Sequence, residues 1–219
     1  MKTIVCYGDS NTWGYMPKRE HPEITANNRF PWGVRWTSLL QMRLGADYRV
    51  VEEGLNGRTT MFDDPLDICR NGLEAIDYSM LTNCPVDLVI LMLGTNDVKE
   101  FFGMPPYVIA RGCGRLIDRI QAGGYGPGGS APQILLVAPI RIGENVVDTD
   151  MSTAFGSYAV GVAAGFGPAY AAVAEECHCA FLDASKIAEP SEQDAIHLTA
   201  EGHRALAEAI CERVKQLLP

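Results

Sequence analysis

The chain has 219 residues, an ordinary globular composition and a formal net charge of −9 at neutral pH. This length suffices for one well-buried core, so we expect a single domain over residues 1–219. The acidic balance argues against a nucleic-acid partner, which needs a basic face, and against docking on an anionic membrane surface.

The apolar runs and the cysteines indicate the cellular compartment in which the protein works. No apolar run reaches the ~18–20 residues that span a bilayer. The run after Met1 and Lys2 is short and ends at Gly8, so no signal peptide is predicted. Seven cysteines, an odd number, lie partly in apolar stretches, which indicates reduced thiols rather than a disulfide framework. We therefore expect a cytoplasmic protein with no membrane partner, and the sequence leaves a homo-oligomer open.

Five short apolar runs predict β-strands. Two of them, Asp87–Leu93 and Gln133–Ala138, are apolar over nearly their whole length, which is typical of strands covered by helices on both faces of a parallel sheet. The predicted strands are Thr3–Tyr7, Tyr48–Glu52, Asp87–Leu93, Gln133–Ala138 and Ala180–Leu182.

Segments of helical length separate or follow these runs. They are Trp32–Leu44, Pro65–Leu81, Pro106–Gln121, Gly156–Glu176 and Thr199–Leu218. The last is the clearest, because Thr199 is a favourable N-cap and an apolar stripe that begins at Leu206 recurs at helical spacing. The alternation predicts a flavodoxin-like three-layer α/β/α sandwich with about five parallel strands.

Two motifs are similar to cofactor or metal sites but occur in the wrong context. Gly124, Gly126 and Gly129 spell G-x-G-x-x-G, yet they follow a helix and precede a strand, whereas a dinucleotide site needs the reverse order. The Cys-His-Cys of residues 177–179 alternates along a strand and has no second pair to complete four ligands. We expect neither a cofactor nor a metal. His203, within the last helix, is expected at the surface.

Four small or polar segments lie where predicted strands end or the last helix begins. They are Ser10, Gly54–Gly57, Gly94–Asp97 and Asp194–His197. In a parallel α/β sheet, ligands bind outside the carboxyl ends of the strands, which meet at one edge. Each segment alone could be a turn or a helix cap. Together at one edge they are better explained as parts of a single site.

Ser10, Asp194 and His197 supply the residue types of a nucleophilic site. A serine hydroxyl is a weak nucleophile until a histidine takes its proton and a carboxylate holds that histidine in the required tautomer. Asp194 and His197 are three residues apart on a predicted loop, so they can share a hydrogen bond. The pattern predicts a serine hydrolase that acts on a small-molecule ester.

The order of these segments resembles the sequence blocks of the SGNH, or GDSL-type, hydrolases. The resemblance rests on Gly8-Asp9-Ser10, the glycine after the second strand, Gly94-Thr95-Asn96-Asp97 and Asp194-x-x-His197, and it covers nearly the whole chain. Residues 34–37 and 53–60 look like the arylesterase/acyltransferase branch. Asn11 departs from the family pattern, which has leucine after the serine. The segment Ile140–Ser157 matches nothing in the pattern and is expected to shape substrate choice.

The resemblance implies a role for each residue. Ser10 would be the nucleophile, His197 the base and Asp194 the carboxylate that orients it. The backbone N–H groups of Ser10 and Gly57 and the side-chain amide of Asn96 would form the oxyanion hole. The implied reaction is hydrolysis of small-acyl, acetyl-like esters, aryl esters included, through an acyl-enzyme, with acyl transfer to alcohols also open.

Two other functions fit the same residues. One is a carbohydrate acetylesterase on the same fold. The other is a non-catalytic binding protein, although a binder has no chemical need for the complete set of Ser, Asp, His, Asn and Gly. Trp13, three residues after Ser10, and Ile196, next to His197, are expected to line the acyl or alcohol pocket, because apolar walls dominate such sites.

Overall fold

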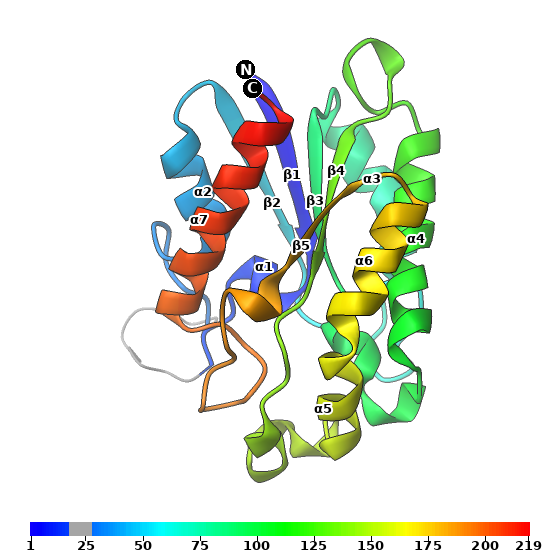
Figure 1. Ribbon diagram of the computed structural model, residues 1–219, viewed down its shortest axis with the longest axis vertical. Coiled ribbons are helices and arrows are strands. Elements are labelled where there is room, and N and C mark those ends of the chain that lie inside the picture. Colours follow the sequence, from blue (N-terminus) through cyan, green and yellow to red (C-terminus); the bar gives the residue numbers. More distant parts are fainter. Residues whose placement is uncertain (18–27) are drawn as a thin grey trace.

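A single parallel sheet organises the chain, and the computed structural model describes residues 1–17 and 28–219 of it (Figure 1). Its strands are hydrogen-bonded in the order β2-β1-β3-β4-β5, and every neighbouring pair is parallel. The strands are β1 (Lys2–Gly8), β2 (Tyr48–Gly54), β3 (Leu88–Met92), β4 (Gln133–Ala138) and β5 (Ala180–Asp183). All five predicted strands are confirmed, with small shifts at their ends.

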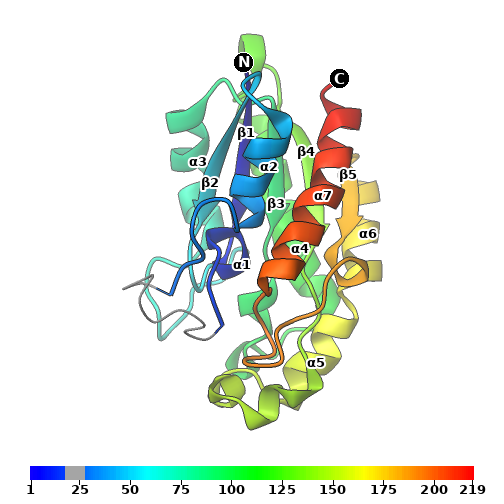
Figure 2. The ribbon, with the colours of Figure 1, turned by 90° about the vertical axis from the view of Figure 1, so that its left-hand side faces the viewer.

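Helices cover both faces of the sheet (Figures 1 and 2). One face carries α2 (Trp36–Leu44) and α7 (Ala200–Leu217). The other carries α3 (Gly72–Asn83), α4 (Pro106–Ala122) and α6 (Phe166–Glu176). The predicted three-layer α/β/α sandwich is therefore confirmed.

Alternate residues of each buried strand serve the two halves of the core. Val5 and Tyr7 of β1 belong to the apolar cluster under α3, α4 and α6, whereas Ile4 and Cys6 belong to the cluster under α2 and α7. Successive strand side chains point to opposite faces, so a strand covered on both sides must be apolar at every position. This is why β3, Leu88–Met92, is apolar throughout and fully or almost fully buried.

Three predicted helices differ from the observed ones. The helix predicted over Trp32–Leu44 begins at Trp36. The helix predicted to start at Pro65 begins at Gly72, after the Asn71 side chain caps it by accepting a hydrogen bond from the Leu73 N–H at 3.0 Å. The helix predicted over 156–176 is divided into α5 (Ser157–Ala164) and α6, which are bent by 44°. Pro168 explains the break, because proline lacks the N–H that a continuous helix needs and clashes with the preceding turn.

The helices were also compared with the length and apolarity that a membrane span requires. Within residues 1–17 and 28–219, none meets both requirements by itself, and the bent pair of α5 and α6 meets them jointly, by length and composition only.

Candidate active site

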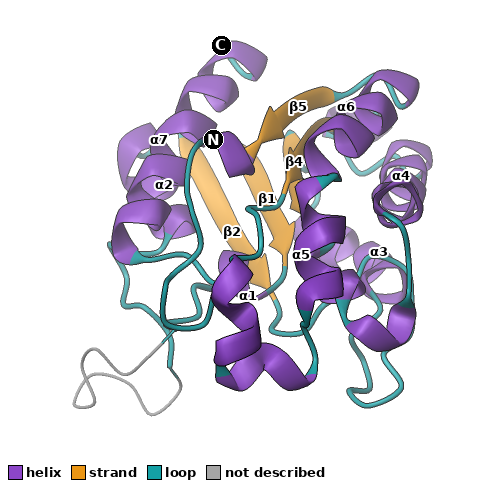
Figure 3. Ribbon diagram, turned by 60° about the horizontal axis from the view of Figure 1, so that its bottom comes forward, coloured by secondary structure: helices purple, strands orange, loops and turns teal. Residues whose placement is uncertain are grey.

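The segments that follow the strands meet at the carboxyl edge of the sheet, the end of the molecule that Figure 3 brings forward. Ser10 opens the short helix α1 (Ser10–Trp13) directly after β1. Asn96 lies in the 3₁₀ turn Thr95–Val98 after β3. Gly57 lies in the turn after β2, and the loop 191–198 leads into α7. The parallel register of β1, β2 and β3 thus brings distant residues to one place.

Ser10, His197 and Asp194 form a hydrogen-bonded chain. His197 Nε2 lies 2.9 Å from Ser10 Oγ, and His197 Nδ1 lies 2.7 Å from Asp194 Oδ2. A carboxylate only accepts hydrogen bonds, so Nδ1 carries the proton and Nε2 is left to accept from the Ser10 hydroxyl. All three residues are at most 6% exposed. This arrangement can transfer the serine proton to the imidazole when the hydroxyl attacks a carbonyl carbon.

Asp194 is held as an anion by its surroundings. Burial alone would raise its pKa, but the hydrogen bond and electrostatic attraction of the His197 ring, together with backbone N–H donors, outweigh burial and lower the pKa below its usual value. The donors are the N–H groups of Ile196 and His197, each 3.0 Å from Asp194 Oδ1. One carboxylate therefore fixes both the fold of the loop and the tautomer of the histidine.

The Ser10 turn is shaped by Gly8 and Asp9. A Cβ at Gly8 would lie 2.1 Å from Thr12 Oγ1 and 2.8 Å from the Met92 carbonyl oxygen, so only glycine fits between β3 and α1. The Asp9 side chain caps α1 by accepting from the Asn11 N–H at 3.0 Å. Burial raises the pKa of Asp9 to about 6.

Asn96 and Gly57, the residues expected as oxyanion donors, lie close to the serine. Asn96 is 6% exposed, and its Nδ2 donates to the Arg58 carbonyl oxygen at 3.0 Å. That bond fixes the amide and uses one of its two N–H groups, so the second can serve a ligand. Gly57 has a φ of 80°, a left-handed conformation that favours glycine. Both residues line the same cavity as Ser10 and His197.

A cavity of about 210 Å³ opens over the serine and the histidine. Its lining contains both apolar and polar residues. The apolar side chains are Tyr15, Met151, Phe155 and Ile196, and the polar ones beyond Ser10, Asn96 and His197 are Asn56, Asp67 and Lys99. This size is below the ~300–1,000 Å³ of typical drug-sized sites, so the cavity suits a small group.

Lys99 brings a nearly buried charge to the cavity lining. Its Nζ lies 2.5 Å from Asp64 Oδ2 and 4.0 Å from Asp67 Oδ2, and its side chain is only 10% exposed. Asp64 is fully buried, and burial by itself would raise its pKa, but the Lys99 hydrogen bond and backbone donors lower it. Sequence reasoning missed Lys99, because a lysine five residues after Gly94 gives no signal until its loop is folded.

Of the two residues expected to line the pocket, Ile196 does so and Trp13 does not. Ile196 lines the cavity and is 2% exposed. In the described part of the chain, the lining contains Tyr15 rather than Trp13. The Tyr15 ring lies against the His197 imidazole, with centroids 4.3 Å apart, whereas the Trp13 ring stacks on the Arg29 guanidinium. Two residues of one tight turn point to different places, which the distance from Ser10 along the chain cannot reveal.

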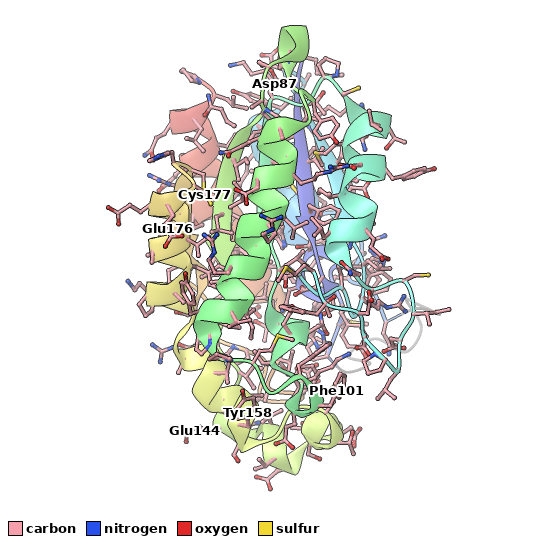
Figure 4. The ribbon with its side chains drawn as sticks, turned by 90° about the vertical axis from the view of Figure 1, so that its right-hand side faces the viewer. Asp87, Phe101, Glu144, Tyr158, Glu176 and Cys177 are labelled. Atoms are coloured by element: carbon pink, nitrogen blue, oxygen red, sulfur yellow. The ribbon has the colours of Figure 1, made fainter. Side chains whose placement is uncertain are left out.

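The segment 140–157 is attached to the histidine loop. The Gly143 N–H donates to the Ala195 carbonyl oxygen at 2.8 Å, and Asn145 Nδ2 donates to the Glu192 carbonyl oxygen at 2.8 Å. The segment also supplies Met151 and Phe155 to the cavity. Figure 4 labels Glu144 and Tyr158 at this end of the molecule, opposite the end that carries Asp87.

Two further expectations concern histidine and metal ligands. His203 is fully buried rather than at the surface, because the Trp36 N–H donates to its Nδ1 and the Phe30 ring packs on its edge. Burial lowers the pKa of His203 to about 3, which keeps it neutral. Among the residues with described positions, no three His, Cys, Asp or Glu side chains are grouped to hold a metal ion.

Comparisons with known proteins identify the family of the chain and proteins that share its fold. The model of the GDSL-like lipase/acylhydrolase family matches residues 6–205. An aryl esterase from M. smegmatis and a carbohydrate acetylesterase from Sinorhizobium meliloti each share 35% identity over the full length of both chains, with a TM-score of 0.90. A lipase/acylhydrolase from Enterococcus faecalis shares the fold at 17% identity and a TM-score of 0.67, over 99% of this chain and 96% of that one.

No curated protein matches the chain in sequence. The family model nevertheless covers most of the 219 residues, and the two solved esterases align over their whole length. The chain therefore belongs to the GDSL-like lipase/acylhydrolase family and is a carboxylic ester hydrolase of the SGNH type.

Proposed function

We propose that Ser10 is the nucleophile of this esterase and that His197 and Asp194 activate it. The Ser10 oxygen bonds to the ester carbonyl carbon while His197 Nε2 takes the hydroxyl proton. The tetrahedral intermediate then expels the alcohol, which leaves with that proton, and an acyl-enzyme remains. Water, or a second alcohol, releases the acyl group by the same steps. The chain of hydrogen bonds from Asp194 through His197 to Ser10 is the observation on which this proposal rests.

We assign the oxyanion hole to the backbone N–H groups of Ser10 and Gly57 and to Asn96 Nδ2. Donors fixed before the reaction stabilise the developing negative charge without reorganising. The support is that Asn96 is buried, that the Arg58 carbonyl oxygen orients its amide, and that Gly57 lines the cavity.

The substrates we propose are esters of small acyl groups, aryl esters among them. The lining of the cavity of about 210 Å³ includes Ser10 and the apolar side chains of Met151, Phe155 and Ile196. A cavity of this size accommodates an acetyl group and excludes a long chain by steric clash. The likeness to an aryl esterase at 35% identity supports the same substrate class.

Acetylated sugars are the second candidate, and the polar residues of the cavity lining favour them. Lys99, Asp67 and Asn56 can exchange hydrogen bonds with hydroxyl groups, which an aryl ester does not offer. The carbohydrate acetylesterase from Sinorhizobium meliloti is as similar in sequence as the aryl esterase.

A panel of esters tests both candidates. The kcat/KM values of p-nitrophenyl esters with two to eight acyl carbons would be compared with those of acetylated xylose and glucose. A small-acyl esterase should lose activity steadily beyond the shortest esters. A fluorophosphonate that labels wild-type protein but not Ser10→Ala would support a catalytic rather than a binding role, and no labelling of the wild type would contradict the proposal.

We also propose that the protein works in a reducing compartment, as expected for the cytoplasm. All seven cysteines, which lie outside residues 18–27, are free thiols. Burial raises the pKa of Cys113 and that of Cys6 well above the usual value of a thiol, so these two thiols remain protonated. Disulfides are rare where the cell keeps thiols reduced. Location of a tagged protein in fractionated cells tests this.

A further inference from the structure

Asn11, the residue that departs from the family pattern, joins the serine turn to the histidine loop. Its side chain is 2% exposed. Nδ2 donates to the Ile196 carbonyl oxygen at 3.3 Å, and Oδ1 accepts from the Leu198 N–H at 2.9 Å. Ile196 and Leu198 are the neighbours of His197 on either side. One amide side chain therefore binds the main chain immediately before and after the histidine.

The amide of Asn11 satisfies both of these backbone groups. A carbonyl oxygen needs a donor and an N–H needs an acceptor, and an asparagine side chain offers one of each in a fixed plane. Leucine, the family's residue at this position, would leave both buried backbone groups without this partner. In this chain the position is therefore chemically specific, although it touches no substrate.

The main chain of Asn11 is itself fixed. The Asn11 N–H donates to Asp9 Oδ1 at 3.0 Å, and its carbonyl oxygen accepts from Trp36 Nε1 at 3.1 Å. Trp36 is fully buried in α2. The backbone of Asn11, next to Ser10, is thus held in place. From there its side chain binds residues 196–198, which are far away along the chain.

We infer that Asn11 is a positioning residue that sets the His197 imidazole relative to the Ser10 hydroxyl, an inference that rests on the proposed triad. The 2.9 Å contact between His197 Nε2 and Ser10 Oγ joins residues 187 positions apart, on two loops without a shared strand. The Asn11 side chain links the serine turn directly to the histidine loop through two hydrogen bonds. Proton transfer depends on this contact, so a small displacement would slow the reaction without weakening substrate binding.

The first test replaces Asn11 by leucine and, separately, by serine, which leaves room for water. Active sites are counted by fluorophosphonate labelling, so that kcat refers to competent enzyme. We expect kcat to fall by about tenfold or more with little change in KM, because a misplacement of 1 Å can cost ~100-fold. Thr12→Val is the matched control: Thr12 is the next residue, it is buried, and within the described chain its hydroxyl has no hydrogen-bond partner.

A double-mutant comparison separates positioning from a general loss of structure. Asp194→Asn acts through the orientation of His197, whereas Asn96→Ala acts on the oxyanion. If Asn11 acts through His197, the effects of Asn11→Leu and Asp194→Asn should combine to less than their product. The fold-reductions in kcat caused by Asn11→Leu and Asn96→Ala should multiply in the double variant. If Asn11 had only a structural role, the effect of Asn11→Leu on kcat would combine in the same way with that of Asp194→Asn as with that of Asn96→Ala.

The outcomes distinguish this inference from the proposed function. Unchanged kcat in folded Asn11→Leu and Asn11→Ser would overturn the positioning role while leaving the triad intact. Failure of both variants to fold would assign Asn11 to stability instead. Activity retained by Ser10→Ala would overturn the proposed function itself.

Discussion

Asp97 accepts three hydrogen bonds from Thr60. The Thr60 N–H lies 3.0 Å and 3.1 Å from the two carboxyl oxygens of Asp97, and the Thr60 hydroxyl lies 2.6 Å from Oδ1. Asp97 follows Asn96, and Thr60 lies three residues after Gly57. A fully buried carboxyl group therefore joins the two loops that carry the proposed oxyanion donors.

Asp97 should make stability depend on pH between about 4 and 7. Burial, followed by the nearby charge of Asp9, raises its pKa to about 7, against the hydrogen bonds of Thr60 that lower it. The folded pKa lies above the unfolded value of about 4, so the folded state binds more protons in this interval. The stability that protonated Asp97 contributes is thus full below about pH 4 and is lost as pH rises through about 7.

Asp97→Asn, which cannot titrate, should remove this dependence. The melting temperature of the variant minus that of the wild type should rise between pH 4.5 and pH 7.5. Asp77→Asn is the control, because the Arg119 and Tyr125 hydrogen bonds lower the pKa of Asp77. The change in stability that titration of Asp77 causes therefore occurs below this pH range. A difference for Asp97→Asn that stays constant across the range would contradict the expectation.

Ser10→Ala should abolish esterase activity. Removing the nucleophile of a comparable triad costs about 10⁴–10⁶ in kcat. The measurement is the hydrolysis of p-nitrophenyl acetate, with circular dichroism to verify folding. Ser130→Ala, at an exposed loop serine, is the matched control and should keep full activity. Activity of Ser10→Ala within tenfold of the wild type would contradict the assignment of Ser10 as the nucleophile.

Asn96→Ala should reduce kcat about 10²–10³-fold with little change in KM, the usual effect of deleting one oxyanion donor. Initial rates over a range of substrate concentrations separate the two constants. Asn83→Ala removes a buried amide at the end of α3, away from the cavity, and should leave kcat unchanged. If KM rose while kcat held, Asn96 would be a substrate-binding residue instead.

Ile196→Ala should widen the cavity and favour longer acyl groups. A pocket that discriminates by size does so by about 1–3 kcal/mol per methylene. The kcat/KM of butyrate and hexanoate esters should therefore gain relative to acetate. Trp13→Ala is the comparison, since the Trp13 ring stacks on Arg29 and should leave the acyl-length profile as it is. A lower melting temperature of Ile196→Ala with an unchanged profile would mean that Ile196 only packs the core.

Patterns within the sequence determined the architecture and the chemistry of this protein. Continuous apolar runs predicted the buried strands, because a side chain on either face of a covered strand must be apolar. Ser10, Asp194 and His197 could be named from their residue types, because the segments at the carboxyl ends of parallel strands meet at one edge. Their hydrogen-bonded geometry followed from that topology. Asn96 and Gly57 were expected from the resemblance to the SGNH hydrolases.

Only the tertiary structure decided which neighbouring side chains meet. Tyr15 rather than Trp13 contacts the histidine, His203 is buried rather than exposed, and Asn11 binds the residues that flank His197. Each depends on contacts between segments far apart in sequence, as between Asn11 and Leu198, 187 residues on. Local propensity describes a residue and its near neighbours along the chain. The partner of a buried polar group is fixed by how the loops pack, and no local pattern contains that information.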